Sequence, residues 1–196
     1  HHAHEDHTPN YDELKSNFDK VRELAREGKI VSAATVKFGG IAEAVSKMSF
    51  GNKIGAAIRS ELWACLAPGN PELAVKFARE DACIDHSGDG IEAEVFFAAL
   101  ESLAFVETDV RKLIDTALTY LSSDSILAEG IRTACSLWDQ THNWETVRDA
   151  LFERYATEFK TNVRINVPFT ALALLSGGGD FGKTICDAAN CGMDTD

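Results

Sequence analysis

The chain has 196 residues, 45% of them hydrophobic and 9% aromatic, which is the composition of an ordinary globular domain large enough to bury a core. Its net charge of −12 argues against a nucleic-acid partner, because proteins that bind a phosphate backbone present a basic face. No stretch approaches the ~20 apolar residues of a membrane span, and no secretory leader opens the chain. We therefore expect no membrane partner, and we expect a cytoplasmic location.

Helical periodicity begins near the N-terminus and continues through the first half of the chain. The first periodic segment stops near Gly28, and Gly39-Gly40 then breaks the chain. Further on, prolines and a glycine at residues 68–71 favour a tight corner between two helices. The helices expected in this half cover residues 11–29, 54–66, 72–83 and 91–105.

The second half of the chain shows the same periodicity. Thr108 is expected to cap a helix, because its hydroxyl can accept an unpaired N–H of the first turn. No run of alternating apolar and polar residues predicts a strand. We therefore expect one all-α domain with short connections. The helices expected here cover residues 109–121, 125–138, 143–159, 167–175 and 180–190.

The five cysteines indicate a reducing compartment. Their number is odd, and no CxxC pair or second Cys/His pair forms a zinc-binding pattern. We expect reduced, mostly buried thiols of a cytosolic protein. They are Cys65, Cys83, Cys135, Cys186 and Cys191.

Three short segments carry residues that suggest chemistry. In the first, GNKIGAAIRSE at residues 51–61, the small residues Gly55, Ala56 and Ala57 open a helix and let a ligand approach its backbone. Unpaired N–H groups at a helix start attract phosphate. The alternative is a close crossing of two helices through small side chains, which this segment taken alone fits better.

The second segment, DACIDHSGDG at residues 81–90, places His86 in a glycine-containing loop. A single loop histidine more often forms a structural hydrogen bond than it acts as a ligand or a base. The neighbouring acids Asp85 and Asp89 could orient its ring.

The third segment is the C-terminal CGMDTD, which sets Asp194 and Asp196 two positions apart. Two such carboxylates repel each other unless a cation lies between them, and Asp with a neighbouring Thr offers the hard oxygen ligands that Mg²⁺ or Ca²⁺ prefers. The alternative is a solvated acidic tail, and these residues alone do not decide between the two. The glycine run at residues 177–179 lacks the GxxxxGK[ST] spacing of a phosphate loop.

In their order along the chain, these segments resemble the ADP-ribosylglycohydrolase family, which includes the dinitrogenase reductase-activating glycohydrolases and the J1 crystallins. Members carry a glycine-rich segment ending in Arg, a PGDPE corner, a REDA motif, a histidine loop and an NxPF…GDF…GxDTD tail. The resemblance predicts a family core over residues 51–196, preceded by a weakly matching helical segment over residues 1–50. The matching positions are 55–59, 68–72, 79–82, His86, 166–169, 179–181 and 192–196.

This resemblance implies a compact multi-helix orthogonal bundle whose cleft holds two Mg²⁺ ions. It also implies hydrolysis of the N- or O-glycosidic bond between ADP-ribose and a protein side chain or a small acceptor. The expected partner is thus an ADP-ribosylated protein or a small molecule that contains ADP-ribose. By carry-over, Asp194 and Asp196 are the metal ligands and catalytic residues, residues 55–57 face the diphosphate, and His86 lines the ADP-ribose pocket.

The implied metal role agrees with the chemistry of the bond. Departure of the leaving group builds oxocarbenium-like positive charge on the ribose. One cation can orient the ribose hydroxyls, and a second can hold a water whose pKa it lowers. No side-chain nucleophile is needed, which is consistent with the lack of a Ser-His-Asp pattern.

Two parts of the family pattern are missing. A TDDT-like metal motif near the N-terminus has only a poor counterpart in EDHT at residues 5–8, and no Thr or Ser follows Asp196. We therefore expect a fragment of a longer enzyme or a diverged relative, and these 196 residues alone should bind Mg²⁺ weakly and be inactive. The alternative function is a non-catalytic ADP-ribose-binding or crystallin-like structural protein on the same fold. A Thr-Asp-Asp-Thr stretch ahead of His1 would favour the enzyme.

Overall fold

The computed structural model describes residues 10–27 and 50–195. The predicted break at Gly39-Gly40, the EDHT stretch at residues 5–8 and the predicted metal ligand Asp196 lie outside these residues. Over the described ranges the chain forms α-helices and short 3₁₀ turns, with no strand and one isolated antiparallel bridge between Lys53 and Asn162. The prediction of an all-α fold is confirmed.

The helices follow one another through short connections. Most of them begin directly after a residue whose side chain accepts an N–H of the first turn, which stabilises the start of the helix. These N-cap residues are Asn70, Asp109, Ser125, Asn143, Asn162 and Asp180. The elements are α1 (Tyr11–Arg26), η1 (Ala57–Arg59), α3 (Ser60–Leu66), α4 (Pro71–Ala82), α5 (Asp89–Leu103), α6 (Val110–Ala117), η2 (Leu118–Tyr120), α7 (Ile126–Thr141), α8 (Trp144–Tyr155), α9 (Val163–Gly177) and α10 (Phe181–Cys191).

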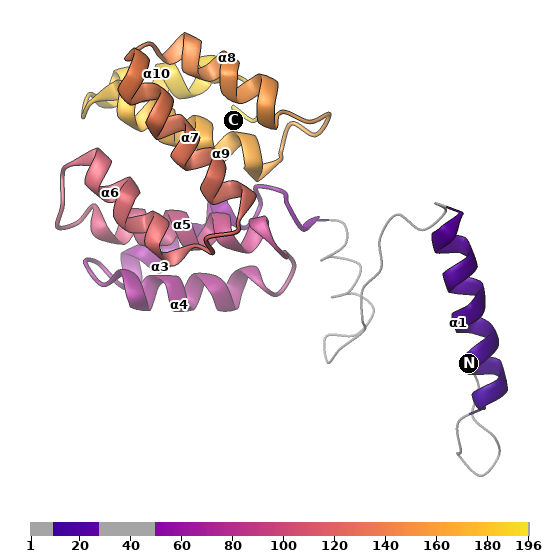
Figure 1. The fold of residues 1–196 in the computed structure, drawn as a ribbon. Helices are drawn as coiled ribbons and strands as arrows, with labels where there is room; N and C mark the ends of the chain where they lie inside the picture. The colour runs from indigo at the N-terminus through magenta and orange to yellow at the C-terminus, as the bar shows by residue number, and fades with distance from the viewer. Residues whose placement is uncertain (1–9, 28–49, 196) are drawn as a thin grey trace.

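Two long apolar helices, α5 and α9, organise the domain. Helix α5 packs against α3, α4 and α6, and helix α9 packs against α7, α8 and α10, so that two groups of helices are seen in Figure 1. One hydrophobic cluster joins the groups, and each of its fully buried large side chains contributes about 1.5–3 kcal/mol of transfer free energy. These include Phe96, Ile114, Leu127, Ile131 and Val167.

Small residues let neighbouring helices approach closely. A Cβ added at Gly130 of α7 would lie 2.8 Å from Cγ of Pro168 in α9, and one added at Gly177 would lie 1.8 Å from Oγ1 of Thr184 in α10. Side chains at these two glycines would therefore force the helices apart. Ala93, Ala98 and Ala99 of α5 are fully buried for the same reason.

The predictions that one helix starts at residue 54 and another at residue 167 are wrong. Residues 54–56 form turns, residues 57–59 form the 3₁₀ helix η1, and α3 begins only at Ser60. Helix α9 already begins at Val163, and Pro168 lies inside it. A proline removes one backbone hydrogen bond and normally marks a helix boundary. Here the cap at Asn162 starts the helix earlier, and the proline ring packs on Gly130 of α7.

The predicted cap at Thr108 is also wrong. The side chain of Asp109 accepts the N–H of Lys112 at 3.1 Å, so α6 begins at Val110. Thr108 instead donates its N–H to the side chain of Glu107 at 2.9 Å. Two adjacent residues of the capping type compete here, and the carboxylate accepts the N–H.

The five cysteines are all free thiols, as predicted, but most of them are not buried. Only Cys135 and Cys191 are buried, whereas Cys65 and Cys186 are exposed and Cys83, the C-cap residue of α4, is partly exposed. Within the ranges that the structure describes, no helix is both long enough and apolar enough to cross a membrane.

Candidate functional site

The segment that leads into Gly55 is attached to the loop before α9. The N–H of Ile54 donates to the carbonyl of Thr161 at 2.9 Å, and the N–H of Val163 donates to the carbonyl of Asn52 at 2.9 Å. Between these two bonds, Lys53 forms the isolated bridge with Asn162. Residues 52–54 are thus held on the start of α9, although more than a hundred residues separate them in sequence.

The structure brings the predicted ligand-binding residues together. The backbone N–H of Ala56 donates to Nε2 of His86 at 3.2 Å. The side chains of Ala56 and Ala57 are buried, whereas Gly55 remains partly exposed. A Cβ at Gly55 would lie 3.4 Å from Cε1 and Nε2 of His86, which is close to ordinary contact. Residues 55–57 and His86 therefore form one cluster, in which the Ala56 amide already has an internal partner.

His86 orients the backbone in this cluster. The ring is 3% exposed, and its Nδ1 lies 2.7 Å from Oδ1 of Asp85. Because Nε2 accepts from Ala56, Nδ1 carries the proton and donates to Asp85. Of the two acids expected to orient the ring, Asp85 does so, and Asp89 is engaged elsewhere. The carboxylate of Asp89 forms an ion pair with Nε of Arg164 at 2.6 Å and accepts a hydrogen bond from the Ser125 hydroxyl at 3.0 Å.

The turn before α5 needs glycine to reach this cluster. A Cβ at Gly90 would lie 2.1 Å from the carbonyl oxygen of Gly51 and 3.1 Å from Cδ2 of His86. Gly88, two residues earlier, has a φ of +52°, in the region that favours glycine. The SGDG sequence therefore lets the first turn of α5 lie directly on the backbone of residue 51 and on the histidine ring.

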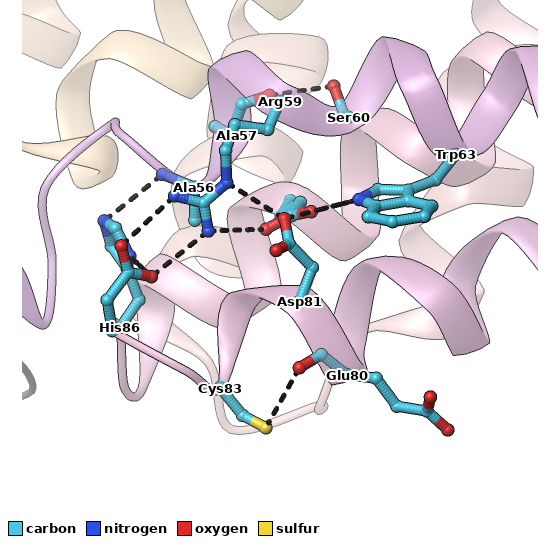
Figure 2. A network of polar contacts seen from close by, with 11 residues as sticks. Ala56, Ala57, Arg59, Ser60, Trp63, Glu80, Asp81, Cys83 and His86 are labelled. Carbon is cyan, nitrogen blue, oxygen red and sulfur yellow. Dashed lines mark hydrogen bonds and ion pairs between the residues drawn. The ribbon is translucent and has the colours of Figure 1, made fainter. Parts of the chain in front are cut away.

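Arg59 extends the cluster into a charged network (Figure 2). Its Nε donates to Asp81 at 2.9 Å, and its two terminal nitrogens donate to Asp85 at 3.2 and 3.1 Å. The guanidinium lowers the pKa of Asp85 to about 2 and thereby keeps the acceptor of His86 ionised. Sequence reasoning noted that the glycine-rich segment ends in this arginine, yet it assigned no partner to Arg59.

Glu94 lies behind this network and was missed in the sequence. Its side chain is 0% exposed, and Oε1 accepts from the indole of Trp63 at 2.9 Å. Oε2 has no hydrogen-bond partner, and its ion-pair distance to Arg59 is 3.9 Å. Burial, reinforced by the nearby charge of Asp81, raises the pKa of Glu94 to about 8. The available signal was a carboxyl within the apolar run IEAEVFFAAL at residues 91–100, but sequence reasoning assigned it no role.

Asp194 follows a constrained turn at the end of α10. Gly192 and Met193 have φ values of +81° and +73°, and a non-glycine residue in this region is held only by its surroundings. Arg148 donates to the carbonyl of Cys191 at 3.0 Å before the turn, and the N–H of Asp194 donates to Oδ1 of Asn166 at 3.1 Å after it. The turn therefore gives the half-buried Asp194 a defined backbone position.

The donor chemistry at this turn suits a hard cation. Asp194 and the exposed Thr195 offer oxygen ligands of the type that Mg²⁺ prefers. Among residues 10–27 and 50–195, no group of three or more His, Cys, Asp or Glu side chains could hold a metal ion. The described residues thus supply one carboxylate of the predicted pair, and its pairing with Asp196 stays a prediction.

A family model described as ADP-ribosylglycohydrolase matches residues 4–196 of the chain. No curated protein and no solved structure matches the chain. The matched range includes the histidine cluster, the Arg59 network and the Asp194 turn.

Proposed function

Since the chain belongs to the ADP-ribosylglycohydrolase family, we propose that it hydrolyses the N- or O-glycosidic bond that joins ADP-ribose to a protein side chain or to a small acceptor. The observation that carries this proposal is the cluster of residues 55–57 and His86, in which the N–H of Ala56 donates to Nε2 of His86 at 3.2 Å. A glycine with a partly exposed backbone lies there beside a buried, oriented histidine, in the segment proposed to face the diphosphate.

The cluster suits an anionic ligand for a physical reason. The chain has a net charge of −12, so general electrostatic attraction does not draw a diphosphate to it. The N–H groups of Ile54 and Ala56 already have acceptors within the protein, so the role proposed for this segment rests on the close approach to the backbone that Gly55 allows. His86 and Asp85 contribute by holding the Ala56 peptide in one orientation.

We further propose that Asp194 and Asp196 hold Mg²⁺, with two ions in the complete site. When bound, Mg²⁺ would supply a water of lowered pKa and orient the ribose hydroxyls. Asp194 contributes a carboxylate on a backbone that two hydrogen bonds position, and Thr195 contributes a neighbouring hydroxyl.

The free thiols favour a reducing compartment, and we place the protein in the cytoplasm on that ground.

Hydrolysis of ADP-ribosyl-arginine and ADP-ribosyl-serine peptides by the full-length protein, each assayed with Mg²⁺ and with EDTA, tests the proposal. We expect release of ADP-ribose from one of these substrates, and we expect EDTA to abolish it. ADP-ribose should also raise the melting temperature, because a ligand at a hundredfold excess over Kd stabilises the native state by about 2.7 kcal/mol. A thermal shift without hydrolysis would favour a non-catalytic ADP-ribose-binding protein, and the absence of both would refute the proposal.

A further inference from the structure

We propose that Asn166 is a positioning residue that fixes the backbone of Asp194 relative to the segment at residues 52–54. The inference rests on the proposed function, in which Asp194 is a metal ligand and the segment leads into the ligand-binding cluster. In this inference, the buried side-chain amide of Asn166 fixes the position of Asp194 relative to residues 52–54.

Both amide hydrogens and the amide oxygen of the Asn166 side chain are hydrogen-bonded. The residue is 5% exposed, and its Nδ2 donates to the carbonyls of Lys160 and Asn162 at 2.6 and 2.9 Å. Its Oδ1 accepts the N–H of Asp194 at 3.1 Å. A flipped amide would direct Oδ1 at two carbonyls and Nδ2 at an N–H, so only one orientation satisfies the three partners.

The two carbonyls that accept from Asn166 belong to the loop that holds residues 52–54. Asn162 forms the bridge with Lys53, and its neighbours Thr161 and Val163 exchange hydrogen bonds with Ile54 and Asn52. A continuous set of hydrogen bonds therefore runs from the segment entering Gly55, through the loop before α9 and the Asn166 side chain, to the backbone of Asp194.

The turn before Asp194 needs such an anchor. Met193 adopts a φ of +73°, a conformation that a non-glycine residue leaves when its surroundings permit. Its side chain packs on the cluster that contains Phe169 and Cys191, which fixes the turn on one side only. The bond from Asp194 N–H to Asn166 fixes the side that carries the carboxylate.

The expected consequence concerns metal affinity. Mg²⁺ requires nearly ideal octahedral geometry, so a small displacement of one carboxylate weakens binding. Loss of a residue that orients a metal ligand typically lowers metal affinity by about 10- to 100-fold. We therefore expect substitutions of Asn166 to weaken divalent-cation binding while the helical domain stays folded.

Two variants and one control, all made in the full-length protein, test this expectation, with Mn²⁺ as the probe of divalent-cation binding. Asn166→Leu keeps a similar volume without polar atoms, and Asn166→Ala provides a smaller replacement if the leucine variant does not fold. Asn143→Ala is the control, because it also removes an asparagine side chain that accepts a backbone N–H, that of Thr146 at 3.0 Å, but at the exposed start of α8. Electron paramagnetic resonance of free Mn²⁺ should report at least tenfold weaker binding for the Asn166 variants and less than a twofold change for the control.

Amide hydrogen exchange supplies a second readout that needs no metal. The Asp194 amide should exchange at least tenfold faster in the Asn166 variants, while amides in the middle of α9 keep their rates. Unchanged Mn²⁺ affinity in a folded Asn166 variant would overturn the inference. If the full-length parent protein binds no Mn²⁺, the metal role proposed above is refuted, and an unchanged Asp194 exchange rate then overturns the positioning role separately.

Discussion

Replacing Glu94 by glutamine isolates the effect of one buried carboxyl on stability. The Glu94 side chain is 0% exposed and lies between the Trp63 indole and the Arg59 network. Glutamine has nearly the same shape and keeps an oxygen that can accept from Trp63. The substitution therefore removes a titrating group while it leaves the packing of α5 nearly unchanged.

The sign and size of the effect follow from the pKa of Glu94, which burial raises from an ordinary 4.5 to about 8. Below pH 4.5 the carboxyl is protonated in both the folded and unfolded states. Between pH 4.5 and about 8 the unfolded chain releases a proton that the folded protein keeps, so the free energy of unfolding falls by about 1.4 kcal/mol per pH unit. Above pH 8 both states are ionised, and the accumulated loss reaches at most about 5 kcal/mol.

Glu94→Gln lacks this titration, so its unfolding free energy should exceed that of the parent by a margin that grows between pH 5 and pH 8. Urea unfolding followed by circular dichroism, at half-unit pH steps, measures the difference. Glu101→Gln on the same helix is the matched comparison, because burial raises the pKa of Glu101 to about 7 and its margin should level off one pH unit earlier. Parallel pH profiles for Glu94→Gln and the parent would refute the reasoning.

Three further substitutions test the site. In the full-length protein, Asp194→Asn should abolish Mg²⁺-dependent hydrolysis while the helical circular dichroism is kept, and unchanged turnover would contradict its role as a ligand. Gly90→Ala places a Cβ 2.1 Å from a backbone oxygen, so it should lower the unfolding free energy by roughly 2 kcal/mol or more, whereas the control Gly182→Ala, with its nearest contact at 3.5 Å, should be neutral or stabilising by up to ~1 kcal/mol. His86→Leu leaves the buried Ala56 N–H without its acceptor and should remove most of the melting-temperature shift given by ADP-ribose, and a full shift in a folded variant would show that the histidine does not position this segment.

Local features of the sequence were sufficient to predict the helical segments, although several helix ends differ from the prediction by three residues or more. The Asn70-Pro71 pair ends one connection and starts α4 because the asparagine side chain accepts from Leu73 N–H at 3.3 Å and proline suits the first helical position. Such signals act over three or four residues and need no tertiary partner. They failed at Pro168, where packing against Gly130 of another helix stabilises a continuous α9.

For the candidate site, too, the sequence predicted one part and the tertiary structure determined the rest. The sequence by itself, through the order of its motifs, predicted the family, and it selected residues 55–57, His86 and Asp194. Only the tertiary structure paired Arg59 with Asp85, buried Glu94 beside Trp63 and placed Asn166 against Asp194. These contacts join residues that are far apart in the sequence, and no periodicity predicts them, because each depends on how separate helices and loops pack in the folded chain.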